Sequence, residues 1–172
     1  MVKIKTIELN LKGKRVKFAD ITNMVKDAIK ESKIKDGICV VISPHTTCSV
    51  YFEEYSHDKF EDGTEYLQYD LNSSLKKIVP DHDDSERYNY PGKAHYEAVE
   101  SWPNASEYLP NGDKTALWNG DAHIKSTIIG SSETFAVENN ELSIGKTGYI
   151  YFVDFDKTRS RIRKCKIVII GD

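Results

Sequence analysis

The C-terminal third of the chain is a succession of strand patterns separated only by turns, which leaves few folds open to it. The segments SETFAVE and ELSIG flank the pair Asn139-Asn140, a two-residue turn of the type that tolerates positive φ. The segments TGYIYFVDF and SRIRKCKIVIIGD follow, joined by a turn from Asp156 to Ser160. These four strands predict a mainly antiparallel sheet.

The first half of the chain mixes strand and helix patterns. VKIKTIELNLKGKRVKFADIT predicts two strands joined at Lys12-Gly13, and ICVVISP and TTCSVYFEE predict two more. Between these pairs, apolar residues at helical spacing predict a helix that Asp36-Gly37 ends. They are Ile21, Val25, Ala28 and Ile29.

A second helix is predicted from Asp58 to Ile78, with an apolar face that ends before Pro80. The polar, proline-broken stretch 81–118 predicts a long irregular loop, and loops of that length are often functional. Trp102 and the tyrosines predict that this loop is ordered, over a pocket or at a subunit contact. The element order predicts one α+β domain over residues 1–172, with two longer helices and one short helix.

Composition narrows the classes of function. The chain has 172 residues, 39% of them apolar, and a net charge of -3, so we expect neither nucleic acid nor membrane as a partner. The segment MVKIKTIELN lacks an apolar signal region. An odd set of cysteines without a CxxC motif (Cys39, Cys48 and Cys165) predicts a reducing cytoplasm.

Polar side chains gather at three turns. His45 lies between two predicted strands, with Glu54 at the far end of the second, and His82 and His95 lie in the long loop. In ALWNGDAHIKSTIIG, Asp121 is expected to cap a short helix from Ala122. His123 then lies in the first turn, where free N–H groups favour an anion. Ile124 and Ile128 share another face, and together with Ile129 we expect them to hold the helix to the sheet.

Ordinary roles remain open for the same residues. A histidine in a loop most often lies at the surface without a function. Asp121 is explained equally well as a helix cap alone, and Glu54 is explained as a solvent-exposed residue at the end of a strand. The arginines of TRSRIRK are also typical of a charged hairpin turn. From the residues alone, histidines at separate turns predict only that they converge on a metal.

The segments SPHTTCSVYFEE, NGDAHIKSTIIG and LSIGKTGYIYFVDFD, with Asp70-Leu71 and the terminal IVIIGD, resemble the YjbQ-type family over nearly the whole chain. Members of this family are identified as secondary thiamine-phosphate synthases. The resemblance implies a compact α+β fold, a homotrimer and a pocket of clustered histidines around a divalent metal, with zinc as the candidate.

Carried over residue by residue, the resemblance implies roles for several side chains, and the anion site that such chemistry needs adds Asp121, Arg159 and Arg161 as candidates. The expected catalytic residues are His45, Glu54, Asp121 and His123. The expected substrate-binding residues are Lys125, Ser126, Arg159 and Arg161. The expected metal ligands are His45, His95 and His123. His95 is the first choice for the third histidine and His82 the second, because the segment 81–119 is longer than the family pattern.

These residues suit transfer chemistry on a phosphorylated small-molecule substrate, which needs an anion site and stabilisation of a leaving diphosphate. Two rival hypotheses stay open. One is a non-catalytic protein that binds a metabolite or a metal. The other is a structural subunit of a larger assembly, with the long loop as its contact surface.

Overall fold

Two β-sheets form the frame of the molecule, and the computed structural model describes residues 1–11 and 13–172. Lys12, at the predicted junction of the first two strands, lies outside the described residues. The strands are β1 (Val2–Leu11), β2 (Lys17–Asp20), β3 (Gly37–Ile42), β4 (Cys48–Glu54), β5 (Ser132–Glu138), β6 (Glu141–Ser143), β7 (Gly148–Asp154) and β8 (Arg161–Gly171). The helices are α1 (Thr22–Ser32), α2 (Tyr66–Ile78), α3 (Lys93–Glu100), α4 (Ala105–Tyr108) and α5 (Gly120–Ile129), with the short 3-10 helices η1 (Pro110–Gly112) and η2 (Lys114–Leu117).

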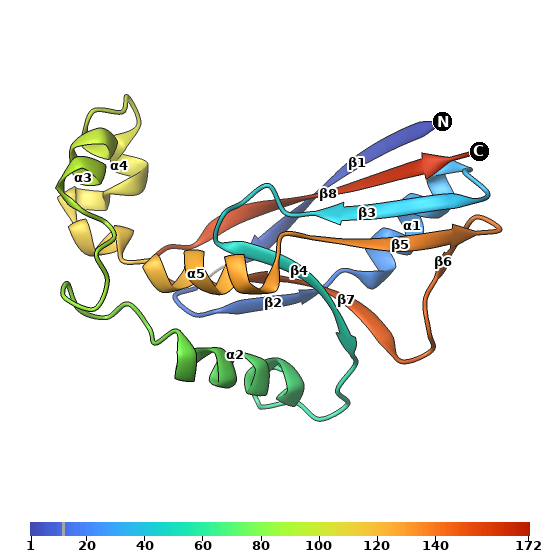
Figure 1. The fold of residues 1–172 in the computed structure, drawn as a ribbon, viewed down its shortest axis with the longest axis horizontal. Helices are drawn as coiled ribbons and strands as arrows, with labels where there is room; N and C mark the ends of the chain where they lie inside the picture. The colour runs from blue at the N-terminus through green and yellow to red at the C-terminus, as the bar shows by residue number, and fades with distance from the viewer. Residues whose placement is uncertain (12) are drawn as a thin grey trace.

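The larger sheet has the order β1-β8-β3-β5-β6 and the smaller one the order β2-β7-β4 (Figure 1). Each pairing of these strands is antiparallel. The predicted α+β class with a mainly antiparallel sheet is therefore confirmed. The turn between β5 and β6 is also as predicted, because Asn139 and Asn140 have φ values of 53° and 61°.

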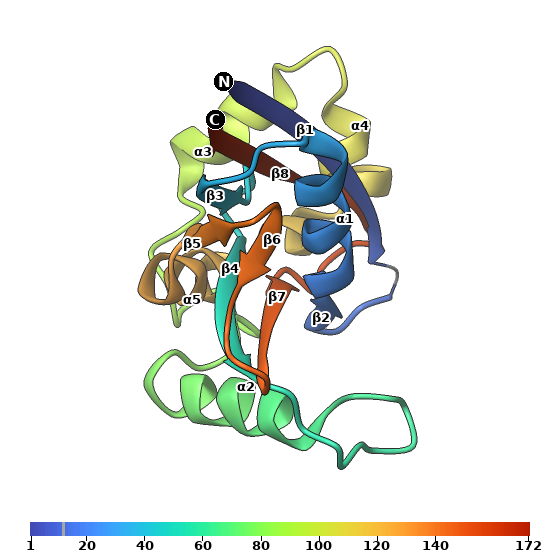
Figure 2. The ribbon, with the colours of Figure 1, turned by 90° about the vertical axis from the view of Figure 1, so that its right-hand side faces the viewer.

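The smaller sheet is covered on both faces, which explains its unbroken burial. Ile150 and Phe152 of β7 point into the main core, where α1 packs. Tyr151 and Val153, which alternate with them, point into a second apolar cluster under α2 and α5. Figure 2 accordingly places α1 and α2 on opposite sides of β7.

The larger sheet leaves one face open to solvent, here called the outer sheet face. Its exposed apolar residues are Val2, Ile4, Ile38, Ile162 and Ile170. Strand register places Val2 and Ile38 on either side of Ile170, so part of this face is a continuous apolar row. Contiguous apolar surface of this kind is typical of association sites.

Helix α2 begins at Tyr66, so the prediction that it begins at Asp58 is wrong. Gly63 has a φ of +84°, and the Asp62 side chain accepts a hydrogen bond from the Thr64 backbone N–H at 2.9 Å. These residues make a tight turn, closed by a bridge between Lys59 and Glu65. The chain therefore enters the helix only after this turn.

The segment 81–118, here called the cap segment, is not the irregular loop that was predicted. It contains α3, α4, η1 and η2. Val99, Leu109 and Leu117 are buried against one another and form a small apolar cluster of their own. Because Pro103 and Pro110 interrupt the chain between these contacts, its helices stay short.

Helix α5 buries a different face from the one predicted. Ile124 and Ile128 are 41% and 53% exposed, whereas Lys125 is completely buried. Asn119, not Asp121, occupies the N-cap position. The expectation that isoleucines hold α5 to the sheet is therefore wrong for Ile124 and Ile128, whereas Ile129 packs against the second apolar cluster as predicted. Lys125 can occupy the buried face because the carboxylate of Asp121 compensates its charge.

Two structural features bear on the predictions about membranes and about a reducing environment. Among the described residues, no helix is both long enough and apolar enough to cross a membrane. Cys39, Cys48 and Cys165 are buried and free of disulfides.

Candidate functional site

A cavity of about 360 Å³ lies between the cap segment and the loops at one end of the sheets. Histidines and arginines from distant parts of the chain line it, and we call it the histidine–arginine cavity. These side chains are His45, His95, His123, Arg159, Arg161 and Arg163. The three predicted histidines and the two predicted arginines are thus brought together, and His95 rather than His82 is the third histidine.

The cap segment supplies the aromatic wall of this cavity, as expected for a loop over a pocket. Tyr90, Trp102 and Tyr108 are the aromatic residues of this wall. The Tyr90 ring lies 4.8 Å from the His95 ring and 5.3 Å from the His123 ring, and its hydroxyl is 3.1 Å from His95 Nε2. Tyr90 therefore positions two histidines, a role that the sequence did not indicate.

His45 is held by the loop between β3 and β4. Its backbone N–H donates to Ser43 Oγ at 3.2 Å, and its Nε2 accepts the Lys164 backbone N–H at 2.8 Å. Burial and then the charge of Arg163 lower the pKa of His45. The imidazole is therefore neutral at pH 7, with its proton on Nδ1.

His123 projects from the first turn of α5 and is half-buried. Burial lowers the pKa of this histidine, although the carboxylate of Asp156 opposes the shift. A neutral imidazole beside cationic side chains is a proton acceptor at neutral pH.

Arg163 holds the cavity wall together. Its guanidinium donates two hydrogen bonds to Asp154, at 2.6 and 2.9 Å, and a third to Thr47 Oγ1 at 3.2 Å. Sequence reasoning missed Arg163, although its period-two spacing from Arg161 on β8 is a signal that both point to one face.

Arg159 and Arg161 bring two guanidinium groups to the cavity. Arg161 Nη2 lies 2.9 Å from Asp156 Oδ2, and Arg159 lies over the Tyr108 ring and binds the Glu107 carbonyl. Arg161 Nη2 thus already faces a carboxylate, whereas the buried Arg159 Nε has no hydrogen-bond partner among residues 1–11 and 13–172. Buried donors of this kind are costly, so they favour an anionic acceptor in the cavity.

Asn119 adds an acceptor beside these donors. Its Nδ2 donates to Asp156 Oδ2 at 2.9 Å, while its buried Oδ1 has no hydrogen-bond partner in the described part of the chain. Burial opposes ionisation of Asp156, but Arg161, Thr158 and Asn119 together lower its pKa. Sequence reasoning missed Asn119, whose position just before the turn at Gly120 was the available signal.

Other predicted site residues lie elsewhere or have structural partners. Glu54 is exposed at the far end of β4, opposite Gly148, and does not line the cavity. Ser126 is buried and donates to the Cys48 carbonyl at 2.8 Å. His82 stacks on Trp118 and accepts the Gly120 N–H at 3.2 Å, so it packs the cap segment.

Lys125 and Asp121 form a buried ion pair with an Nζ–Oδ2 distance of 2.8 Å. Lys125 Nζ also lies 3.2 Å from Asp81 Oδ1, at the start of the cap segment. The expected substrate-binding role of Lys125 is wrong, because its side chain has no exposed surface and its charge is already paired.

The three cavity histidines are the predicted ligands of a divalent metal. Within residues 1–11 and 13–172, no group of three or more histidine, cysteine or acidic side chains is placed to hold one. His45 Nε2 and His95 Nε2 already have hydrogen-bond partners. The divalent metal therefore stays a prediction.

Comparison with known proteins gives one consistent family. The model of the family described as "YjbQ: UPF0047 protein YjbQ-like" matches residues 5–172. The UPF0047 protein MJ1081 of Methanocaldococcus jannaschii is 30% identical over 160 residues, which cover 93% of this chain and 89% of the relative. The UPF0047 protein YugU of Bacillus subtilis is 26% identical over 168 residues, which cover 98% of this chain and 99% of the relative.

Solved structures agree with the fold. A YbjQ-like protein of unknown function from Sulfolobus solfataricus P2 superposes with a TM-score of 0.70 at 22% identity and covers 100% of this chain and 99% of that one. A yjbq/upf0047 family protein from Clostridium acetobutylicum gives a TM-score of 0.67 at 30% identity, with 96% and 99% covered.

Proposed function

Since this chain belongs to the YjbQ-like UPF0047 family, we propose that its histidine–arginine cavity binds a phosphorylated small molecule and catalyses a transfer reaction on it. The observation that carries the proposal is the buried Arg159 Nε, which has no hydrogen-bond partner among the described residues and lies in a cavity that Arg161 also lines. Phosphate oxygens satisfy guanidinium donors at short range. Asn119 Oδ1 would accept a hydrogen bond from a hydroxyl or amine next to the phosphate.

The charged and neutral side chains of the cavity suit two steps of such a reaction. The arginines stabilise negative charge that develops on a leaving phosphate or diphosphate. His123, neutral at pH 7, accepts a proton from water or a hydroxyl group that attacks the phosphorylated substrate. In a thiamine-phosphate synthase-like transfer, the diphosphate leaves the methylene carbon of the pyrimidine and the attacking thiazole nitrogen carries no proton, so the arginines carry that step.

Replacement of Arg159 by methionine is expected to weaken binding of inorganic diphosphate roughly ten- to a hundredfold. A hydrogen bond to a charged group contributes about 1.5–3 kcal/mol, and each 1.4 kcal/mol changes affinity about tenfold. Among the described residues Arg159 has no carboxylate partner, so its loss leaves no buried acid uncompensated. Isothermal titration calorimetry of parent and variant measures the effect.

The matched control is Arg87→Met, because Arg87 is exposed on the cap segment and does not line the cavity. It should bind diphosphate like the parent. Equal affinities for all three proteins, or no binding by the parent, would contradict the proposal.

A non-catalytic binding protein is the second candidate. It is favoured by the hydrogen bonds that already engage His45 Nε2 and His95 Nε2, since these nitrogens are not free to transfer protons. Tight binding of phosphorylated compounds without turnover of any of them would select this alternative.

We also propose that copies of this chain associate as the homotrimer that the family resemblance implies. The apolar row on the outer sheet face supports association, since Val2 and Ile4 are 58% and 66% exposed. Three buried thiols without disulfides fit a reducing cytoplasm, which is our proposal for the location.

Replacement of Ile4 by lysine is expected to convert the trimer to a monomer, because it places a charge in the apolar row. Sedimentation at micromolar concentration measures the mass. Ile78→Lys is the control, because Ile78 is 69% exposed on α2 and away from the outer sheet face. A monomeric parent would rule out the assembly, and a trimeric Ile4→Lys variant would place the contact elsewhere.

A further inference from the structure

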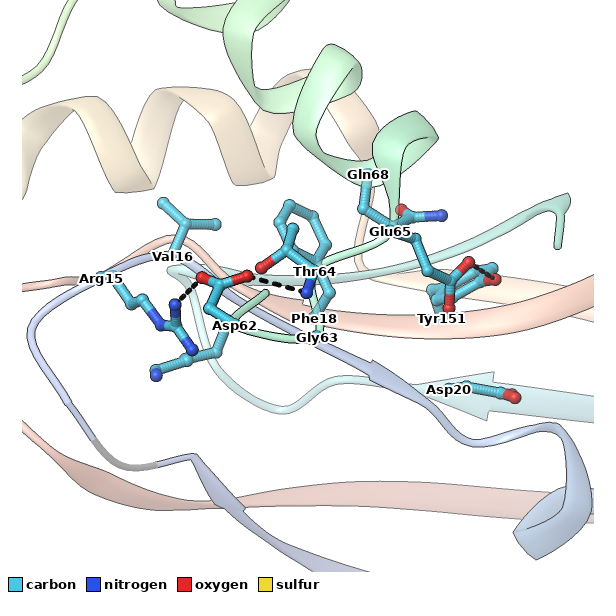
Figure 3. Close-up of a pocket in the computed structure, with 11 residues that line it drawn as sticks. Arg15, Val16, Phe18, Asp20, Asp62, Gly63, Thr64, Glu65, Gln68 and Tyr151 are labelled. Carbon is cyan, nitrogen blue, oxygen red and sulfur yellow. Dashed lines mark hydrogen bonds and ion pairs between the residues drawn. The ribbon is translucent and has the colours of Figure 1, made fainter. Parts of the chain in front are cut away.

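A second cavity, of about 120 Å³, lies between the start of β2, the turn before α2 and the strand β7 (Figure 3). It shares no lining residue with the histidine–arginine cavity. The Arg15–Asp62 ion pair lies at one end, and Glu65, Gln68 and Tyr151 lie at the other. The proposed function does not use any of these residues.

The inner end of this cavity is built from buried polar side chains. Glu65, Gln68 and Tyr151 are 8%, 1% and 1% exposed. The Tyr151 hydroxyl donates to Glu65 Oε2 at 2.8 Å, and the Ser56 backbone N–H donates to the same oxygen at 3.2 Å. The other oxygen, Oε1, has Lys59 Nζ as its ion-pair partner at 3.9 Å, which is beyond hydrogen-bond length. Glu65 Oε1 is therefore an acceptor that a ligand can use.

Gln68 supplies the complementary donor. Its Oε1 accepts a hydrogen bond from the Tyr51 hydroxyl, while its Nε2 is buried without a hydrogen-bond partner among residues 1–11 and 13–172. An amide N–H removed from water without a partner destabilises the fold. A hydrogen-bond acceptor on a ligand in the cavity would remove that penalty. An apolar side chain in place of Gln68 would also avoid the penalty, so the glutamine itself favours a ligand.

We propose that this second cavity binds a small molecule that carries an amide or urea group. The carbonyl oxygen of such a group accepts from Gln68 Nε2, and its N–H donates to Glu65 Oε1. The volume limits the occupant to roughly five non-hydrogen atoms, because a cavity of about 150 Å³ is filled by benzene. Arg15 and Asp62 are exposed, so their ion pair can open to admit it.

Gln68 is the only glutamine of the chain, which makes the test direct. Protein labelled with ¹⁵N at the glutamine side chain gives a single NH₂ pair in the NMR spectrum. Titration with acetamide is expected to shift this pair to saturation. Acetone has the same shape and carbonyl but no N–H, so it should bind at least tenfold more weakly.

Two variants separate the site from a general solvent effect. In Gln68→Met, which keeps the volume, acetamide should no longer shift the backbone signals of Thr64 and Tyr151. Tyr69→Phe changes an exposed neighbour on α2 and should respond like the parent. The proposal is overturned if acetamide leaves the Gln68 signal unchanged, or if acetone shifts it equally. These titrations of the parent decide the question even where Gln68→Met does not fold.

Discussion

Replacement of Lys125 by methionine is expected to lower the free energy of unfolding by about 3–5 kcal/mol. The Lys125 side chain has no exposed surface and that of Asp121 is 3% exposed, so the variant leaves a carboxylate buried without its counterion. Removal of one partner from a buried pair is strongly destabilising for this reason. Urea unfolding followed by circular dichroism measures the change.

Two control proteins make this result specific. The double variant Lys125→Met/Asp121→Leu removes both charges and should recover most of the loss. Lys26→Met changes an exposed lysine on α1 and should alter stability by about 0.5 kcal/mol or less. A Lys125→Met protein as stable as Lys26→Met would show that the pair does not stabilise the fold.

Lys125 also positions the cap segment, through a second ion pair with Asp81. Burial opposes ionisation of Asp81, but the ammonium groups of Lys157, Lys76 and Lys125 hold its pKa below the usual range. Asp81 thus connects the end of α2, the helix α5 and the turn before β8 at the point where the cap segment begins. Loss of Lys125 is therefore expected to loosen the wall that carries Tyr90 and His95.

Replacement of His123 by alanine is expected to lower activity by a factor of roughly 100 or more, as removal of a general acid–base group does. Stability should change by about 1 kcal/mol, since the side chain is only half-buried. The assays are formation of thiamine phosphate from the pyrimidine diphosphate and the thiazole phosphate, and hydrolysis of simple phosphate esters.

The pH profile of the parent should show which form of His123 acts. Burial lowers its pKa, so the neutral base predominates above a pKa that lies below about 6.5. Activity should therefore be constant at neutral pH and fall as pH decreases through that lowered pKa. His57→Ala, in an exposed loop, is the control and should keep the profile of the parent. A His123→Ala protein that melts like the parent and keeps full activity would refute the catalytic role.

Local patterns were enough to predict much of the fold. The spacing of Val25, Ala28 and Ile29 identified α1, and all three are buried. Asn139-Asn140 identified its hairpin, because few other residues tolerate positive φ at two successive positions. Such features depend on neighbours in the sequence, which is why a sequence alone reveals them.

Features that depend on distant partners were missed. The burial of Lys125 rests partly on Asp81, 44 positions away, and the pattern of α5 favoured the isoleucines as the core face. The cap helices depend on contacts among Val99, Leu109 and Leu117 across several turns. Within the site, His45, His95 and His123 were identified through a family resemblance, whereas Asn119 and Tyr90 became apparent only from their contacts.

Strand β8 contributes to the histidine–arginine cavity and to the outer sheet face at once. Arg161 and Arg163 point toward the cavity, and Ile162 between them is 60% exposed. A slip of β8 by one residue against β1 and β3 would exchange these two sets of side chains. A single-residue insertion or deletion in the turn before β8 would therefore damage both surfaces together, whereas a change of two residues would preserve the alternation.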